Sequence, residues 1–312
     1  MLFFHLLTFY LLTDINSFLF IKKNFMKINN PLNRIINIKQ NTIYKNEKLF
    51  LINNTNIIDK KIITISPGGF YGFYLFGIVS FIKDNYNLTD YIFTGASAGS
   101  WISLSLCYKN DMKNLFDKIM CKNISNIDSI IELEYSLKYK LLNNFNDNDF
   151  DLHKLFVGIT TIKNFKILTN IFTDFNSLED AINACIASSH IPFITSGFFS
   201  NKYYNMYNFD GGFSSYPYIN TSKPVLNITP NLFDRIKNNQ ENNQENIKSE
   251  KKNIIKNFKI MVSLVKKNSL NFNELYGNGY NDALKHKWYF DKIFISKNIT
   301  KYITIIYNVS NA

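Results

Sequence analysis

The pentapeptide GASAG at residues 95–99 is the feature that most restricts how this chain folds. It follows residues 90–94 (DYIFT), a short run typical of a β-strand, and leads into an apolar run with helical character. This order matches the G-x-S-x-G nucleophile elbow, in which a strained strand-to-helix turn lifts a serine hydroxyl clear of a sheet. Gly95 and Gly99 would let neighbouring backbone approach closely, and the new helix would direct its positive end at Ser97. The pattern therefore predicts Ser97 as a nucleophile.

A similar unit precedes it. Residues 61–66 (KIITIS) are rich in β-branched side chains, which favours a strand that ends at the glycines of residues 67–72 (PGGFYG). An apolar helix is expected over residues 73–83. Strand, helix, strand and helix in succession predict a parallel sheet with covered faces.

The glycine-rich loop at residues 67–72 offers a second chemical signal. Acyl transfer needs fixed N–H donors that face the tetrahedral oxyanion beside the nucleophile, and this loop lies one strand-helix unit before Ser97. Its backbone amides are unhindered, so we expect an oxyanion hole here. A nucleotide-binding loop fits less well, because the loop is not G-x-G-x-x-G and no G-K-[ST] follows it.

Asp210 is the strongest candidate for the base that Ser97 needs. It ends an apolar segment and is followed by two glycines, which places a carboxylate on a turn compact enough to meet another loop. A conventional α/β-hydrolase triad is the alternative, since Ser97, Asp210 and His286 stand in the expected chain order. His286 lies in a Lys-His-Lys-Trp stretch typical of a solvated helix face, and His190 is more typical of a packing residue.

Four motifs in order resemble the patatin-like phospholipase family: PGGFYG at 67–72, GASAG at 95–99, ASSHIP at 187–192 and DGG at 210–212. Residues 275–283 (LYGNGYNDA) also resemble a helix near the C-terminal end of that family. The resemblance implies an α/β fold, a three-layer α/β/α sandwich with a mainly parallel central sheet.

The resemblance also implies a site and an activity. A Ser–Asp dyad would consist of Ser97 as nucleophile and Asp210 as base, with Gly68, Gly69 and Gly72 as the oxyanion-hole residues. Such a lipid acyl hydrolase would cleave fatty-acyl esters of phospholipids or acylglycerols without metal or organic cofactor. Its partner would be lipid at a membrane or lipid-droplet surface. A catalytically silent lipid-binding module of the same fold is the alternative from another class.

Residues 1–60 are expected to form an apolar and then Asn-rich lead-in to one hydrolase domain at 61–312, which carries a low-complexity insertion at 237–257. Residues 1–12 are mostly apolar without a preceding Lys or Arg, so a weak signal peptide, an interfacial anchor and a leader before an internal start at Met26 are all open. The expected location is cytoplasmic or peripheral membrane. The middle, residues 111–151, is expected to be helical. Residues 155–161 and 165–168 are expected to be paired strands.

The formal net charge of +11 would attract anionic partners, but the excess of Asn, Lys, Ile, Phe and Tyr indicates a composition bias as its source. No basic run with interleaved aromatics marks a nucleic-acid groove. The three cysteines contain no C-x-x-C pair, which argues against a zinc site. The acidic loop that begins at Asp147 fails as an EF-hand, because Leu152 and Gly158 stand where glycine and glutamate are needed.

Overall fold

The computed structural model describes residues 42–45, 48–50, 59–120, 127, 129–163, 166–192, 194–195, 200–214, 216–241 and 271–297. The apolar residues 1–12 and residues 242–257 of the low-complexity insertion lie outside these ranges. Within them, no helix has both the length and the apolar character needed to cross a bilayer.

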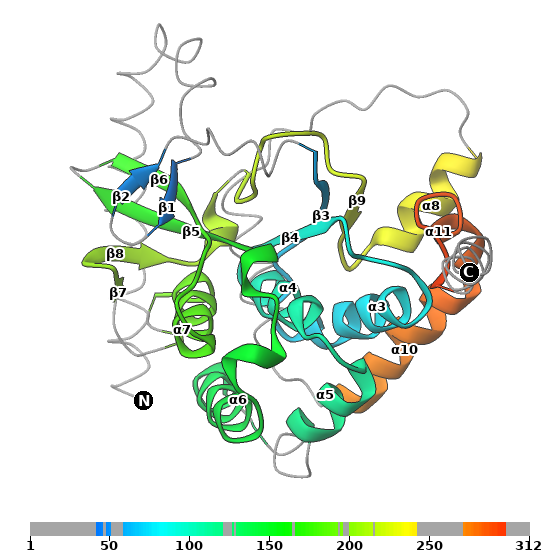
Figure 1. Cartoon of the computed structure of the whole chain (residues 1–312), viewed down its shortest axis with the longest axis horizontal. Coiled ribbons are helices and arrows are strands. Elements are labelled where there is room, and N and C mark those ends of the chain that lie inside the picture. Colours follow the sequence, from blue (N-terminus) through cyan, green and yellow to red (C-terminus); the bar gives the residue numbers. More distant parts are fainter. Residues whose placement is uncertain are drawn as a thin grey trace, which may run out of the picture. The chain divides into compact units, whose positions relative to one another are not determined.

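A mixed β-sheet runs through the molecule in the order β2-β1-β6-β5-β4-β3-β9. Its strands are β1 (Thr42–Lys45), β2 (Lys48–Phe50), β3 (Lys61–Ile65), β4 (Tyr91–Gly95), β5 (Leu155–Lys163), β6 (Lys166–Phe172) and β9 (Leu226–Ile228). Four of the six neighbouring pairs in this order are parallel. A hairpin of β7 (Asn201–Tyr203) and β8 (Met206–Phe209) pairs antiparallel with β5. The prediction of an α/β fold with a mainly parallel central sheet is confirmed (Figure 1).

Helices flank this sheet. They are α3 (Gly72–Asn85), α4 (Ala98–Cys107), α5 (Met112–Ile119), α6 (Ile130–Asn144), α7 (Leu178–Ser188), α8 (Leu232–Glu241), α10 (Phe272–Lys285) and α11 (Lys287–Phe290). Several begin at a side-chain cap: Ser129 Oγ accepts the Glu132 amide at α6, and Ser177 Oγ accepts the Asp180 amide at α7. Such caps satisfy amides that have no partner inside the helix, so the local sequence sets where these helices begin.

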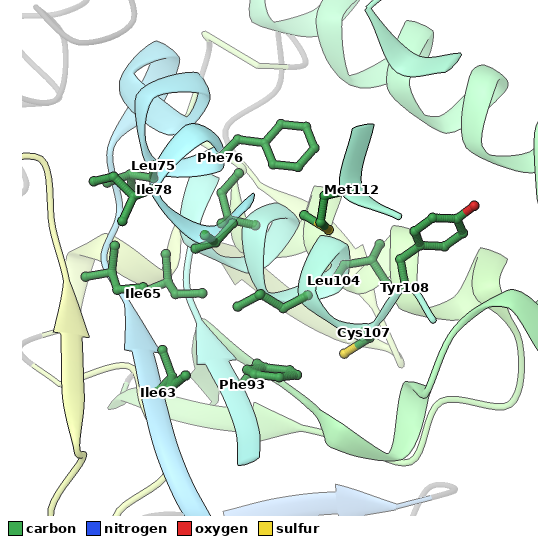
Figure 2. Close-up of a cluster of buried hydrophobic side chains, with 14 of the residues drawn as sticks. Ile63, Ile65, Leu75, Phe76, Ile78, Phe93, Leu104, Cys107, Tyr108 and Met112 are labelled. Atoms are coloured by element: carbon green, nitrogen blue, oxygen red, sulfur yellow. The ribbon is translucent and has the colours of Figure 1, made fainter. Parts of the chain in front are cut away.

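The main core lies between the sheet and α3 and α4. Ile63, Ile65 and Phe93 point from β3 and β4 toward these helices and meet Leu75 and Leu104 (Figure 2). All are almost fully buried. Strands that are buried on both faces read as continuous apolar runs, which is why KIITI and YIFTG show no alternation. On the outer side of α3, stacked rings of Phe73 and Phe272, with centroids 4.3 Å apart, attach α10.

The opposite face of the sheet carries a second, smaller apolar cluster. Its members are Ile62, Ile92, Phe156, Ile171 and Ile219. The segment that brings Ile219 there runs from the Asp210 turn to β9, and it is tied to the sheet where the Val225 amide donates to the Ile62 carbonyl at 2.9 Å. The chain thus reaches the opposite face of the sheet between Asp210 and β9.

Several predicted elements are confirmed and others extend further than expected. The helix at 178–188 has the predicted bounds, and the paired strands at 155–161 and 165–168 are β5 and β6, which pair antiparallel. The strands β1 and β2 come from the predicted lead-in, so the sheet also draws on residues before 61. At the other end, α8 continues through the first residues of the predicted insertion, where Lys237 is exposed.

Candidate active site

Ser97 stands at a sharp turn between β4 and α4. Its backbone has φ 54° and ψ −132°, a conformation that a residue with a side chain adopts rarely and at a cost on the order of 1–3 kcal/mol. The two flanking glycines make the turn possible. A Cβ on Gly95 would lie 2.1 Å from the Gly99 carbonyl oxygen, and one on Gly99 would lie 2.2 Å from that of Ile65. No side chain fits at either position, so the elbow depends on both glycines.

A serine pair holds the Ser97 backbone in place. The Ser97 amide donates to Ser188 Oγ at 2.8 Å, and the Ser188 hydroxyl donates to the Gly158 carbonyl at 2.7 Å. From within α4, Ser100 Oγ donates to the Ser97 carbonyl at 2.6 Å. Ser188 belongs to the ASSHIP motif at 187–192, whose sequence alone predicted no role for this residue. The strained turn is therefore fixed by α7 and β5.

Asp210 lies directly behind the elbow and is fully buried. Its Oδ1 accepts the Gly212 amide at 2.6 Å, and its own amide donates to the His190 carbonyl at 2.7 Å. A Cβ on Gly211 would lie 2.7 Å from that of Ala96, so the Asp-Gly-Gly turn and the elbow are in direct contact. This packing brings the Asp210 carboxyl to the Ser97 hydroxyl.

Burial raises the pKa of Asp210 to about 7, while the Ser97 hydroxyl and the Gly212 amide act in the opposite direction. Among the described residues, none donates a well-aligned hydrogen bond to Asp210 Oδ2. The Ser97 hydroxyl therefore lies close enough to influence this carboxyl, but the contact is loose. Catalytic hydrogen bonds are often long in a site without substrate and tighten when it binds.

The glycine-rich loop lies beside Ser97. Gly69 has φ 53°, in the left-handed region, and begins a short 3-10 turn (η2, Gly69–Tyr71) that leads into α3. Within the described residues, no hydrogen bond uses the amide of Gly68 or Gly69. The Gly72 amide differs, because it donates to the carbonyls of Gly69 and Phe70. Gly72 instead allows close packing, since a Cβ there would lie 3.1 Å from that of Ala98.

A cavity of about 680 Å³ lies beside the nucleophile elbow and the glycine-rich loop. Gly68, Gly69 and Ser97 line it at the elbow. The apolar part of its wall comes from helices α4, α5 and α6 and includes Ile102, Leu115, Ile119, Leu133, Leu137 and Leu141. A polar part comes from the segment around β9 and from α8 and includes Tyr216, Asn227, Thr229, Asn231 and Arg235. The hydroxyl of Ser97 thus faces a space with one largely apolar and one polar side.

The imidazole rings of His286 and His190 lie away from the Ser97 hydroxyl. His286 Nδ1 contacts the Asp282 carbonyl at 2.8 Å, and its ring stacks on Phe233 with centroids 4.4 Å apart. It does not line the cavity. His190 is buried, with Nδ1 3.1 Å from Thr195 Oγ1, and it contributes its backbone carbonyl to Asp210. The predicted alternative of a Ser97–Asp210–His286 triad does not fit this placement.

The acidic loop that begins at Asp147 has structural roles. Asp147 Oδ1 accepts the Leu178 amide at 2.6 Å, and Asp149 closes a capping box with Asn146. Among the residues that the structure describes, no group of three or more His, Cys, Asp or Glu side chains is arranged to hold a metal ion.

Comparison with known proteins identifies the family of this chain. Among curated proteins, none matches the chain. A sequence model of patatin-like phospholipases matches residues 63–219, about half of the 312 residues. The matched range begins in β3, includes every predicted site residue from Gly68 to Asp210, and ends at Ile219 on the far face of the sheet. The chain belongs to the patatin-like phospholipase family, a family of lipid acyl hydrolases.

Proposed function

We propose that this protein hydrolyses fatty-acyl esters of phospholipids or acylglycerols through a dyad of Ser97 and Asp210. The observation that carries the proposal is the contact between a buried carboxyl and a serine held in a strained turn at the wall of a partly apolar cavity. Strained backbone and raised pKa values gather at functional sites, because catalysis needs groups in unusual environments.

The first half of the reaction forms an acyl-enzyme. Asp210 accepts the Ser97 proton while Oγ attacks the ester carbonyl, and a bond forms between Oγ and the carbonyl carbon. The amides of Gly68 and Gly69 have no other acceptor among the residues that the structure describes, so they would donate to the oxyanion of the tetrahedral intermediate. The carbon–oxygen bond to the alcohol then breaks, and the alcohol leaves with the proton from Asp210.

The second half returns the enzyme to its starting state. Asp210 takes a proton from water, and the resulting hydroxide attacks the acyl carbon. The bond to Ser97 Oγ breaks, Ser97 regains its proton from Asp210, and the fatty acid leaves. The apolar side chains of α4, α5 and α6 that line the cavity would hold the acyl chain, since burial of each methylene contributes about 0.8 kcal/mol.

The proposed hydrolysis can be tested with purified wild-type protein, Ser97→Ala and Asp210→Asn. Each is incubated with a panel of phospholipids and acylglycerols, and the products are identified by mass spectrometry. We expect fatty acid release by the wild type alone. Retained lipid binding without release by any of the three would instead support a silent lipid-binding module.

We also propose that the substrate is taken from a lipid surface. The motivation is the apolar segment at residues 1–12 together with Lys22, Lys23 and Lys27, which suits an interfacial anchor. Deletion of residues 1–26 should weaken sedimentation with anionic vesicles and leave hydrolysis of a soluble short-chain ester intact. Equal sedimentation of both proteins would refute the anchor.

A further inference from the structure

Glu134 is a buried carboxyl group for which the proposed reaction has no use. It lies on α6, is 8% exposed, and is the one carboxylic acid among the described residues that line the cavity. Its Oε1 lies 2.6 Å from Ser189 Oγ at the end of α7. The same Ser189 Oγ accepts the Trp101 indole N–H from α4 at 3.2 Å. One hydroxyl thus joins three helices around the cavity.

The hydrogen bonds of this group can all be made when Glu134 carries a proton, whereas an ionised Glu134 would take the Ser189 hydroxyl proton from the Cys185 carbonyl, which keeps the Ser189 amide at 3.0 Å. Ser189 Oγ also lies 2.8 Å from the Cys185 carbonyl oxygen, which can only accept. A protonated Glu134 donates to Ser189, and Ser189 donates to Cys185. An ionised Glu134 would receive the single proton of Ser189 and, within the described residues, no ion pair. A buried anion with one donor is costly, so the neutral arrangement is favoured.

We propose that Glu134 is a positioning residue that works as a neutral carboxylic acid, and that its link through Ser189 holds Trp101 and the end of α7 in the geometry the active site needs. The proposal rests on the proposed acyl hydrolase function. Trp101 lies one helical turn after Ser97 and lines the cavity. Ser188, next to Ser189, accepts the Ser97 amide. Ionisation of Glu134 would therefore disturb both the cavity wall and the support of the nucleophile.

The charges around Glu134 agree with a neutral state. Burial is the main cause that raises the pKa of Glu134 to about 8; the Ser189 hydroxyl opposes the rise and the negative charge of Asp210 adds to it. The thiol of Cys185 on α7 stays neutral, since burial raises its pKa to about 12. On α6, Lys138 pairs with Glu179 at 2.8 Å and Lys140 donates to the Ile119 carbonyl. As pH rises, Asp210 is therefore expected to ionise before Glu134.

Trp101 can report this ionisation without any substrate. The chain has two tryptophans, so Trp288→Phe leaves Trp101 as the single indole. In that protein we expect the emission of Trp101 to change with one midpoint near pH 8 as a charge forms beside it. The same titration with Glu134→Gln added should be flat, because glutamine donates to Ser189 at every pH. Lys83, whose pKa burial lowers to about 8, donates to the Leu106 carbonyl near the C-terminal end of α4 and does not line the cavity, so its titration should leave the Trp101 emission unchanged in both proteins.

The pH dependence of ester hydrolysis is the second test of the role of Glu134. With a soluble short-chain ester, kcat/KM of the wild type should fall above about pH 8, whereas Glu134→Gln should keep its value there and stay within a few-fold of the wild type below it. Glu132→Gln, an exposed change on the same helix, should follow the wild type. Glu134→Ala should be at least about tenfold less active at every pH, since it leaves Ser189 without its donor.

The two arms separate the two proposals. If Glu134→Gln abolishes the Trp101 titration but the wild type hydrolyses no ester, the link between Glu134, Ser189 and Trp101 is supported and the proposed function is rejected. A titration that persists in Glu134→Gln, or an alkaline loss of activity that persists there, would overturn the role of Glu134. If Glu134→Gln does not fold, Glu134→Met replaces it, because it also removes the ionisable carboxyl; a Trp101 titration that persists there would overturn the proposal.

Discussion

The elbow side of the cavity and the wall formed by α6 and α7 are built in different ways. Around Ser97, the geometry comes from backbone: a strained turn, two glycines that no side chain can replace, and the contact with the turn at Asp210. Along the other wall, it comes from side chains far apart in sequence, as Ser189 meets Glu134 across 55 residues and Trp101 across 88. Short sequence motifs therefore predict the side that is built from backbone. The wall that is built from side chains forms only when the helices pack.

The two buried carboxyls show the same contrast. Burial raises the pKa of Asp210 to about 7 and that of Glu134 to about 8. Asp210 accepts a hydrogen bond from a backbone amide of its own turn, which favours the charged form. Glu134 contacts one hydroxyl, which can pair with a neutral carboxylic acid as well as with a carboxylate. Two groups of similar chemistry are thus suited to opposite roles, one as a base and the other as a neutral donor.

The largest effect is expected from Asp210→Asn. The amide still accepts the Gly212 N–H but cannot accept the Ser97 proton, so kcat should fall on the order of 10³-fold or more. Activity of the wild type should rise with pH through about 7 as Asp210 ionises. Steady-state rates against pH, for both proteins, give the comparison. A variant that retains a tenth of the wild-type rate would contradict the assignment of Asp210 as base.

The same variant should be more stable than the wild type. Because burial raises the pKa of Asp210 from 3.8 to about 7, ionisation destabilises the fold by on the order of 4 kcal/mol at pH 8. This penalty is absent below about pH 4, where the folded and unfolded chains are both protonated, and it grows as pH rises to about 7. Thermal melts should therefore show a higher Tm for Asp210→Asn at pH 8 and no difference near pH 4.

Gly95→Ala tests the backbone-built region directly. Its Cβ would lie 2.1 Å from the Gly99 carbonyl oxygen, so we expect a loss of at least about 3 kcal/mol in the free energy of unfolding. Gly277→Ala is the matched control. A Cβ at Gly277 of α10 meets nothing within 4 Å, and alanine favours a helix by up to about 1 kcal/mol. Urea unfolding of both variants should give changes of opposite sign, and equal changes would refute the steric argument.

Ser188→Ala removes the acceptor of the Ser97 amide. A buried donor left without a partner costs about 1–3 kcal/mol, so we expect kcat to fall by roughly 10- to 100-fold in a folded protein. Ser105→Ala on α4 is the control, because among the described residues the Ser105 hydroxyl bonds only the Ile102 carbonyl of its own helix. It should remain within a few-fold of the wild type. Rates for the two variants that do not differ would show that Ser188 has no part in holding the nucleophile.

The smallest effect is expected from His286→Ala. His286 contacts Asp282 and Phe233 and does not line the cavity, so the rate should stay within a few-fold of the wild type while Tm falls slightly. A folded His286→Ala without activity would reinstate the triad. A circular dichroism melt must precede the rate measurement.

Sequence patterns located the elements that carry local signals. The β-branched run of β3, the apolar run of β4 and the capped helix α7 were all predictable within a residue or so. The strands β1 and β2 were missed, because three or four residues in an Asn-rich segment have no periodicity and depend on pairing with distant β6. Long-range pairing is not visible in a short window.

The site follows the same rule. The structure brings together Ser97, Asp210 and the glycines of the first loop, all of which lie in motifs. Three further residues, Ser188, Ser189 and Glu134, were given no role in advance. The serines lie in the quoted ASSHIP motif, so the motif pointed to the position without its chemistry. Glu134 lies in an ordinary amphipathic helix, and only packing reveals that its carboxyl is buried.

Reaction with a fluorophosphonate tests the central claim most directly, because such a probe modifies an activated serine beside an oxyanion hole. Wild-type protein should be labelled at Ser97, as located by mass spectrometry of peptides. His286→Ala should be labelled at a similar rate, and Asp210→Asn at least about 100-fold more slowly. Labelling at a serine other than Ser97, or an equal rate in folded Asp210→Asn, would contradict the account.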